Sequence, residues 1–210
     1  MLPKLVTLES CTVCKLKCRG CCLHRGVEAG VGVGYLTFEN FAKFLGMNPF
    51  IEGVDLTNVG EVFYNPDLLE ILEYAYSRGI TIDLWDTSFH DVHEEILKAL
   101  VRCNVCHIKI SISGATPESY AWYCRGGDFE KVIANVKKVN QYKEKYENSY
   151  PQLFWQYIIL EKTDSKREIQ KAKKLAKELG FTKITFIKDN DGYVPKNKKM
   201  IYEETGLKYD

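Results

Sequence analysis

Short apolar runs alternate along the chain with longer segments in which apolar residues recur every three or four positions. The short runs predict strands, and the longer periodic segments predict helices. The predicted strands cover residues 4–9, 53–57, 80–85, 107–113, 153–160 and 183–187. The predicted helices cover residues 38–45, the segment between Asp67 and Gly79, residues 91–101, 129–145 and 165–179, and a short stretch near Tyr202.

Residues at the ends of the predicted helices are of types that commonly begin or end a helix. Thr37 and Asp67 are expected to be N-caps, because their side-chain oxygens accept hydrogen bonds from the first turn. Gly79 and Gly180 are expected to end their helices in the left-handed conformation. Residues 153–160 are nearly all apolar, which predicts a strand buried on both faces.

Six strand–helix steps in series require parallel strands joined by right-handed crossovers. The sequence therefore predicts an α/β fold with a partial, TIM-barrel-like (β/α)6 arrangement, an open version of the eight-stranded barrel. Functional residues gather at the C-terminal ends of the strands in such folds. We expect residues 1–190 to form the core domain and residues 191–210 to form a short polar C-terminal tail or a truncated extension.

Composition narrows the classes of function. At 210 residues and 45% hydrophobic content, the chain is expected to form one domain with a sizeable core. A formal net charge of +1 gives no strong field that would favour nucleic acid or a membrane surface. The sequence has no apolar stretch of about 20 residues and no secretory leader at its start, so we expect a cytoplasmic protein.

Cysteines crowd the segment that follows the first predicted strand. Five of the eight lie within twelve residues, and three have the spacing C-x3-C-x2-C, namely Cys14, Cys18 and Cys21. Three thiolates so spaced suit a [4Fe–4S] cluster with one iron left open. Zinc is an alternative, since two C-x2-C pairs supply four thiolates, but zinc ribbons place about 15–20 residues between the pairs. An electron-transfer cluster with Cys11 or Cys22 as fourth ligand is another alternative.

The segment Cys14-Lys-Leu-Lys-Cys18-Arg-Gly-Cys21 resembles the signature of the radical S-adenosylmethionine (radical SAM) superfamily. Two later segments, 58–68 and 109–118, resemble the phrases "G-x-G-E-P-x-x-N-P-D-L" and "I-S-I-D-G-A-T-P-E" of the SPASM/twitch-type branch. The branch's C-terminal cysteine-rich extension is missing, as expected of a minimal member or a truncated chain. Gly20 stands where relatives commonly have an aromatic residue.

The resemblance implies an oxidoreductase that uses a [4Fe–4S] cluster to cleave SAM reductively, giving a 5′-deoxyadenosyl radical that abstracts hydrogen from a substrate. Cys14, Cys18 and Cys21 are the cluster ligands that it implies. Glu61 would bind the amino group of SAM, and Arg125 would pair with its carboxylate. The full set of SAM-binding residues implied is Gly60, Glu61, Ser111, Ser113, Arg125 and Gln156.

The substrate is open at this point. A peptide is the first expectation because of the branch resembled, and a small molecule is the alternative. The loops 86–93, with Asp86 and His90, and 188–200 are expected to contact the substrate. Flavodoxin or ferredoxin is the expected electron donor. A non-catalytic iron–sulfur protein that transfers electrons or assists a partner enzyme is the rival interpretation.

Overall fold

A computed structural model describes residues 2–24 and 32–209. Its centre is one six-stranded sheet in which neighbouring strands are parallel and follow chain order. This architecture confirms the predicted α/β fold with an open, partial barrel. The strands are β1 (Leu5–Thr7), β2 (Gly53–Asp55), β3 (Thr81–Thr87), β4 (His107–Ser111), β5 (Gln152–Ile159) and β6 (Lys183–Lys188).

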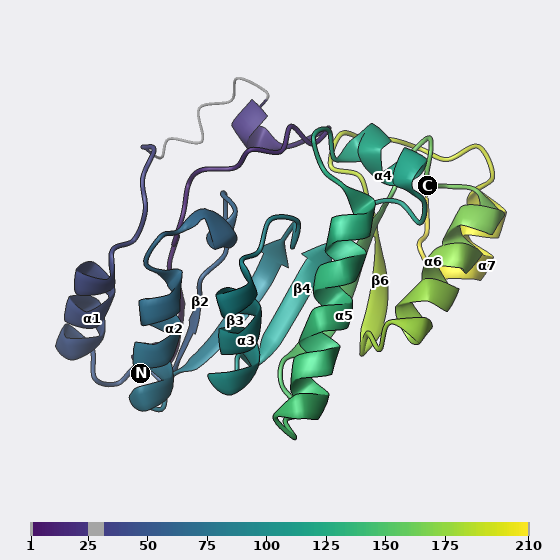
Figure 1. Cartoon of the computed structure of the whole chain (residues 1–210). Helices are drawn as coiled ribbons and strands as arrows, with labels where there is room; N and C mark the ends of the chain where they lie inside the picture. The colour runs from purple at the N-terminus through teal and green to yellow at the C-terminus, as the bar shows by residue number, and fades with distance from the viewer. Residues whose placement is uncertain (1, 25–31, 210) are drawn as a thin grey trace.

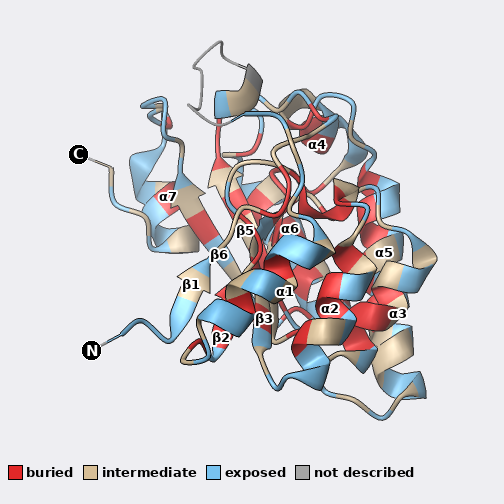
Figure 2. Cartoon of the chain, turned by 90° about the vertical axis from the view of Figure 1, so that its left-hand side faces the viewer, coloured by how far each residue is buried: buried red, intermediate tan, exposed pale blue. Residues whose placement is uncertain are grey.

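Helices join successive strands. Figures 1 and 2 show α1, α2, α3 and α5 together on one side of the sheet. The α-helices are α1 (Phe38–Met47), α2 (Leu68–Ser77), α3 (Glu94–Arg102), α4 (Pro117–Tyr123), α5 (Phe129–Lys145), α6 (Lys166–Glu178) and α7 (Lys198–Thr205). Short 3₁₀ turns, η1 (Cys22–His24) and η2 (Val62–Tyr64), follow the cysteine segment and β2. Within the described residues, no helix has the length and apolar character needed to cross a bilayer.

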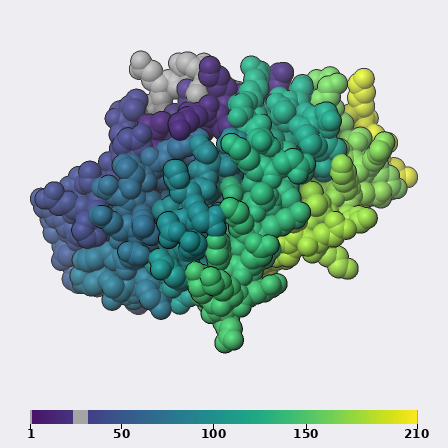
Figure 3. Space-filling model, in the orientation of Figure 1, coloured from purple at the N-terminus to yellow at the C-terminus, as the bar shows by residue number. Residues whose placement is uncertain are grey.

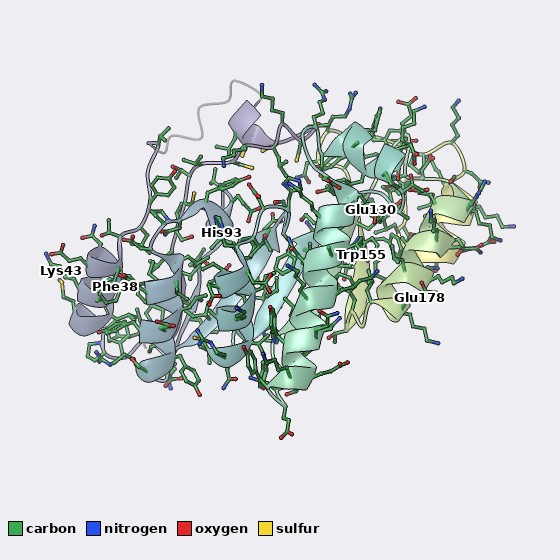
Figure 4. The ribbon with its side chains drawn as sticks, viewed as in Figure 1. Phe38, Lys43, His93, Glu130, Trp155 and Glu178 are labelled. Atoms are coloured by element: carbon green, nitrogen blue, oxygen red, sulfur yellow. The ribbon has the colours of Figure 1, made fainter. Side chains whose placement is uncertain are left out.

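The two faces of the sheet differ in burial. On β5, the alternate side chains from Leu153 to Ile159 are buried, and Trp155, labelled in Figure 4, is fully enclosed. The side chains between them, Phe154, Gln156 and Ile158, are only half-buried. The prediction that this strand is buried on both faces is therefore wrong. In the described part of this open barrel, α1, α2, α3 and α5 cover one face of the sheet, and we call the opposite one the open face.

The helix ends mostly agree with the sequence. Thr37 caps α1, because its hydroxyl accepts a hydrogen bond from the backbone of Asn40 at 3.2 Å. Gly79 and Gly180 have φ angles of 68° and 70°, as expected at helix C-termini. Asp67 precedes α2 but does not cap it; its carboxylate accepts instead from the Phe38 N–H of α1 at 3.0 Å.

Two further differences concern the later part of the chain. Strand β4 ends at Ser111, two residues before the predicted end, and Ser113 lies beyond it. Helix α4 has no counterpart among the predicted helices, although Thr116 begins it with a capping box. Helix α7 confirms the predicted short helix near Tyr202, and its buried Ile201 joins the hydrophobic core.

Candidate active site

The cysteine segment crosses the end of the sheet at which the strands finish. Figure 1 shows it in purple over the top of the molecule, and Figure 3 shows that it reaches the surface there. The thiols of Cys14, Cys18 and Cys21 are half-buried and form no disulfide. The segment after the first strand therefore places the three predicted cluster ligands at the C-terminal edge of the sheet, where the functional groups of parallel α/β folds lie.

The loop after β2 holds the cysteine segment from one side. The backbone N–H of Glu61 donates to the carbonyl of Val13 at 2.9 Å. A Cβ atom on Gly60 would lie 2.0 Å from the carbonyl oxygen of Cys11, so only glycine permits this approach. The Glu9 carboxylate fixes the loop itself by accepting from the N–H of Val59 at 2.7 Å.

The end of α4 and the residues just after it hold the same segment from the other side. The N–H of Lys17 donates to the carbonyl of Arg125, and that of Arg19 donates to the carbonyl of Tyr123, each at 2.9 Å. The Arg19 Nε also donates to the carbonyl of Trp122 at 2.8 Å, and its guanidinium lies 4.5 Å from the centre of the Trp122 ring. These contacts fix the cysteine segment without using any of the three thiols.

The electrostatics of the thiols fit a cationic metal cluster. Burial raises the pKa of Cys14 to about 12, and the nearby thiols of Cys18 and Cys21 act in the same direction. Burial also raises the pKa of Cys21. The pKa of Cys18 is lowered, because the buried thiol of Cys124 donates a hydrogen bond to it. Cys14 and Cys21, which resist ionisation alone, become thiolates when iron supplies the compensating charge.

The two other early cysteines differ from this set in burial, although Cys22 contacts the thiol of Cys21. Cys11 is 1% exposed, and its sulfur accepts a hydrogen bond from the Val13 N–H at 3.3 Å, within its own loop. Cys22 is exposed at the start of η1. Neither therefore has the half-buried character that Cys14, Cys18 and Cys21 share.

Glu61 is buried and bound to the loop after β3. Its carboxylate accepts hydrogen bonds from the Thr87 hydroxyl at 2.8 Å and from the Ser88 N–H at 2.7 Å, and the Ser88 hydroxyl donates to it as well. Burial raises the pKa of this carboxyl. Glu61 therefore connects the cysteine segment to the end of β3.

This raised pKa predicts that the cofactor-free protein loses stability as the pH rises. A buried carboxyl whose folded-state pKa exceeds the unfolded value of about 4.3 stabilises the fold fully below that value. The stabilisation disappears as the pH rises through the folded-state pKa, because the unfolded chain releases its proton first.

Glu61→Gln removes this titration. We therefore expect the free energy of unfolding, measured in denaturant from about pH 4 to pH 8, to fall less steeply in Glu61→Gln than in the unmodified protein. Equal slopes in the two proteins would contradict the assignment.

A second polar group lies on the open face. The Ser111 hydroxyl donates to Asp86 at 2.7 Å, and the Gln156 amide donates to the Ser111 oxygen at 3.2 Å. Ser113 differs from Ser111, since it is fully buried and its hydroxyl accepts from the Ile158 N–H at 3.4 Å. The Ser113 side chain takes the place of a ladder bond beyond the end of β4.

Arg125 is exposed next to the cysteine segment. Its carbonyl is bound by Lys17, whereas its guanidinium makes no hydrogen bond or ion pair with the described part of the chain. This leaves the charged group available to an anion.

Sequence reasoning missed several contributors to this site. Cys124, at the end of α4, lies against Cys18 although more than a hundred positions separate them. Glu9 and the Thr87–Ser88 pair likewise hold the loop after β2. Glu9 follows a strand and precedes the cysteines, which is the one local signal that marks it.

The model of the family described as "Radical SAM superfamily" matches residues 8–150, about two thirds of the chain. No curated protein matches the sequence significantly.

Several solved structures share the fold. SuiB of Streptococcus suis bound to S-adenosylmethionine has a TM-score of 0.68 at 12% identity, over 90% of this chain and 39% of SuiB. SuiB bound to its precursor peptide SuiA has a TM-score of 0.72 at 13% identity, and the match covers 99% of this chain and 43% of SuiB. Methylornithine synthase (PylB) has a TM-score of 0.66 at 14% identity, and the match covers 91% of this chain and 57% of the synthase. The chain thus spans about two fifths of SuiB.

Proposed function

The chain belongs to the radical SAM superfamily, and from this premise we propose that it abstracts hydrogen from a peptide substrate at the site described above. It is a radical SAM enzyme, with a [4Fe–4S] cluster and SAM as cofactors. When bound, these cofactors supply a 5′-deoxyadenosyl radical, the species that abstracts hydrogen from substrate. The protein's part is to bind the cofactors, to orient the substrate and to exclude water.

The observation that carries this proposal is the cysteine segment. Three half-buried thiols are held by backbone contacts on both sides at the C-terminal edge of a parallel sheet. We propose Cys14, Cys18 and Cys21 as the cluster ligands, with SAM on the adjoining part of the strand ends. Because other groups fix the segment, the thiols are left to bind iron.

Glu61 is proposed to bind the amino group of SAM. Three hydrogen bonds from Thr87 and Ser88 occupy part of its carboxylate, which has about four acceptor positions. The Phe63 backbone N–H also donates to this carboxylate, so the ammonium group would share an acceptor position or displace one of these donors. Gly60 is proposed to act through the backbone, since its missing side chain lets the loop lie against Cys11 beneath the cofactor.

Ser111 and Gln156 are proposed to contact SAM from the open face, where Gln156 donates to Ser111. Ser113 is proposed to support this edge from inside, since it binds the backbone of β5. The substrate would lie over the same face, beside Asp86, and flavodoxin or ferredoxin is the proposed electron donor.

Arg125 is proposed to pair with the carboxylate of SAM. Replacing it by alanine should weaken SAM binding by about tenfold or more, since a charge-assisted hydrogen bond contributes about 1.5–3 kcal/mol. Equilibrium dialysis of SAM against the reconstituted enzyme measures this, with Lys17→Ala as the control for a lost positive charge on the adjoining cysteine segment. Equal losses in the two variants would assign the effect to net charge instead.

Two observations support a peptide as substrate. The sequence resembles the branch described above, and the fold is similar to that of SuiB, which has been crystallised with its precursor peptide. The open face also offers two large half-buried rings, Trp85 and Phe154, which suit apolar side chains.

Deuterium transfer tests the substrate class. The reconstituted, reduced enzyme and SAM are incubated separately with a peptide digest and with a small-metabolite extract, both from cells grown in heavy water. Mass spectrometry then measures deuterium in the 5′-deoxyadenosine formed. We expect deuterium from the peptide digest and none with Cys14→Ala. Deuterium from the metabolite extract alone would overturn the peptide proposal and leave the enzyme assignment intact.

A further inference from the structure

A second group of metal-binding side chains lies away from the cysteine segment. Asp83 on β3 and His107 on β4 are direct partners in the strand register, and Cys106 immediately precedes β4. Each of the three offers a ligand atom within 4.8 Å of the others. They lie at the beginning of their strands, whereas the cysteine segment lies at the opposite, C-terminal edge.

The imidazole of His107 is oriented for metal binding. Its Nδ1 lies 2.8 Å from Oδ1 of Asp83, and in the tautomer whose Nδ1–H donates to this carboxylate, the lone pair of Nε2 can bind a metal. This is the arrangement in which a carboxylate orients a histidine ligand of zinc. The ring also stacks on Trp85, with centroids 5.0 Å apart and an interplanar angle of 22°, which restrains its rotation.

The distance between the Cys106 sulfur and the His107 ring is close to that expected for two zinc ligands. The Cys106 Sγ lies 3.8 Å from the His107 Nε2. In a tetrahedral zinc site, bond lengths of about 2.3 Å to sulfur and 2.0–2.1 Å to nitrogen place these two atoms about 3.6 Å apart. Thiolate and imidazole ligands together favour zinc over the harder cations magnesium and calcium.

The surroundings leave room for further ligands. The side chains of His107 and Asp83 are 29% and 26% exposed, so solvent reaches the group. A cavity of about 220 Å³ lies beside it, lined by Asp55, Asp83 and Trp85 among others. Coordination positions that the chain does not fill are therefore open to water or to a donor atom of a bound molecule.

We propose that Cys106 and His107, with Asp83 behind the imidazole, form an open zinc site on the open face of the sheet. Cys106 Sγ and His107 Nε2 are the direct ligands, and Asp83 fixes the tautomer or adds a carboxylate oxygen. Zinc binding at this site does not depend on SAM chemistry. The zinc proposal can therefore be tested separately from the proposed function.

Zinc content of the holoenzyme tests the site. The iron–sulfur enzyme is reconstituted anaerobically, dialysed against micromolar zinc chloride, and its iron and zinc are measured by mass spectrometry. We expect about one zinc per chain in addition to a full complement of iron, and loss of that zinc in Cys106→Ser and His107→Ala. Cys103→Ser is the matched control, since it removes a nearby half-buried thiol and should retain zinc.

Asp83→Asn gives an independent test in case the ligand variants fold poorly. It should keep the fold and the iron content but lower zinc affinity by about 10–100-fold. X-ray absorption at the zinc edge should show one sulfur, with the other ligands nitrogen or oxygen. Failure of the holoenzyme to retain zinc would overturn the proposal. A zinc with three sulfurs that persists in Cys106→Ser would also overturn it, because that metal would be at the early cysteines.

Discussion

Replacing Cys14, Cys18 and Cys21 together by alanine is expected to abolish both the iron–sulfur cluster and the cleavage of SAM. Without the three thiolates, the segment retains its backbone contacts but no ligand for iron. After anaerobic reconstitution, the variant should contain iron and sulfide at the level of a protein without a cluster. No 5′-deoxyadenosine should form above the uncatalysed level.

Cys11→Ala and Cys22→Ala are the controls for this result. The Cys11 sulfur is held within its own loop, and Cys22 is exposed, so both variants should keep the cluster and the activity. A cluster that survives the triple replacement, or one that disappears in Cys22→Ala, would contradict the ligand assignment.

Gly60→Ala is expected to have the second largest effect. The new Cβ would lie 2.0 Å from the carbonyl oxygen of Cys11 and 2.8 Å from the carbonyl carbon of Thr12, so backbone must move. Overpacking of this kind costs about 1–3 kcal/mol of stability. Because the displaced backbone carries the cysteine segment, SAM cleavage should fall by about 100-fold, the effect of misplacing reacting groups by about 1 Å.

Gly46→Ala is the matched control, because a Cβ at this exposed position of α1 meets no heavy atom within 4 Å. It should leave SAM cleavage unchanged and stabilise the protein by up to about 1 kcal/mol, as expected for alanine in a helix. Denaturant unfolding and 5′-deoxyadenosine formation are measured on both variants. Unchanged activity in Gly60→Ala would show that the loop does not position the cluster.

The sequence predicted the fold well where the signal is local. The spacing of apolar residues and the ends of α5 depend on neighbours in the chain, so the predicted helix 129–145 agrees fully with the structure. The burial of β5 was not predictable in this way. Its run of apolar residues fits a fully covered strand, but Phe154 and Ile158 lie on the open face, opposite α1, α2, α3 and α5, and are half-buried.

In the site too, local features are predictable from the sequence and contacts between distant segments are not. Sequence spacing marks the cysteines, but it does not show that Cys124 donates to Cys18 or that Ser88 binds Glu61, because these pairs form only when the strands assemble. At Gly20, the structure gives a reason why glycine stands where relatives commonly have an aromatic residue. Its φ of 82° lies in the left-handed region, where an aromatic residue would be strained.

The central claim is that Cys14, Cys18 and Cys21 hold a cluster with an iron open to SAM. Low-temperature electron paramagnetic resonance of the reconstituted enzyme, reduced with dithionite and recorded with and without SAM, tests it most directly. The account predicts a [4Fe–4S]+ signal whose shape changes when SAM is added. A signal indifferent to SAM, or a colourless protein that contains zinc at these cysteines and no cluster, would contradict it.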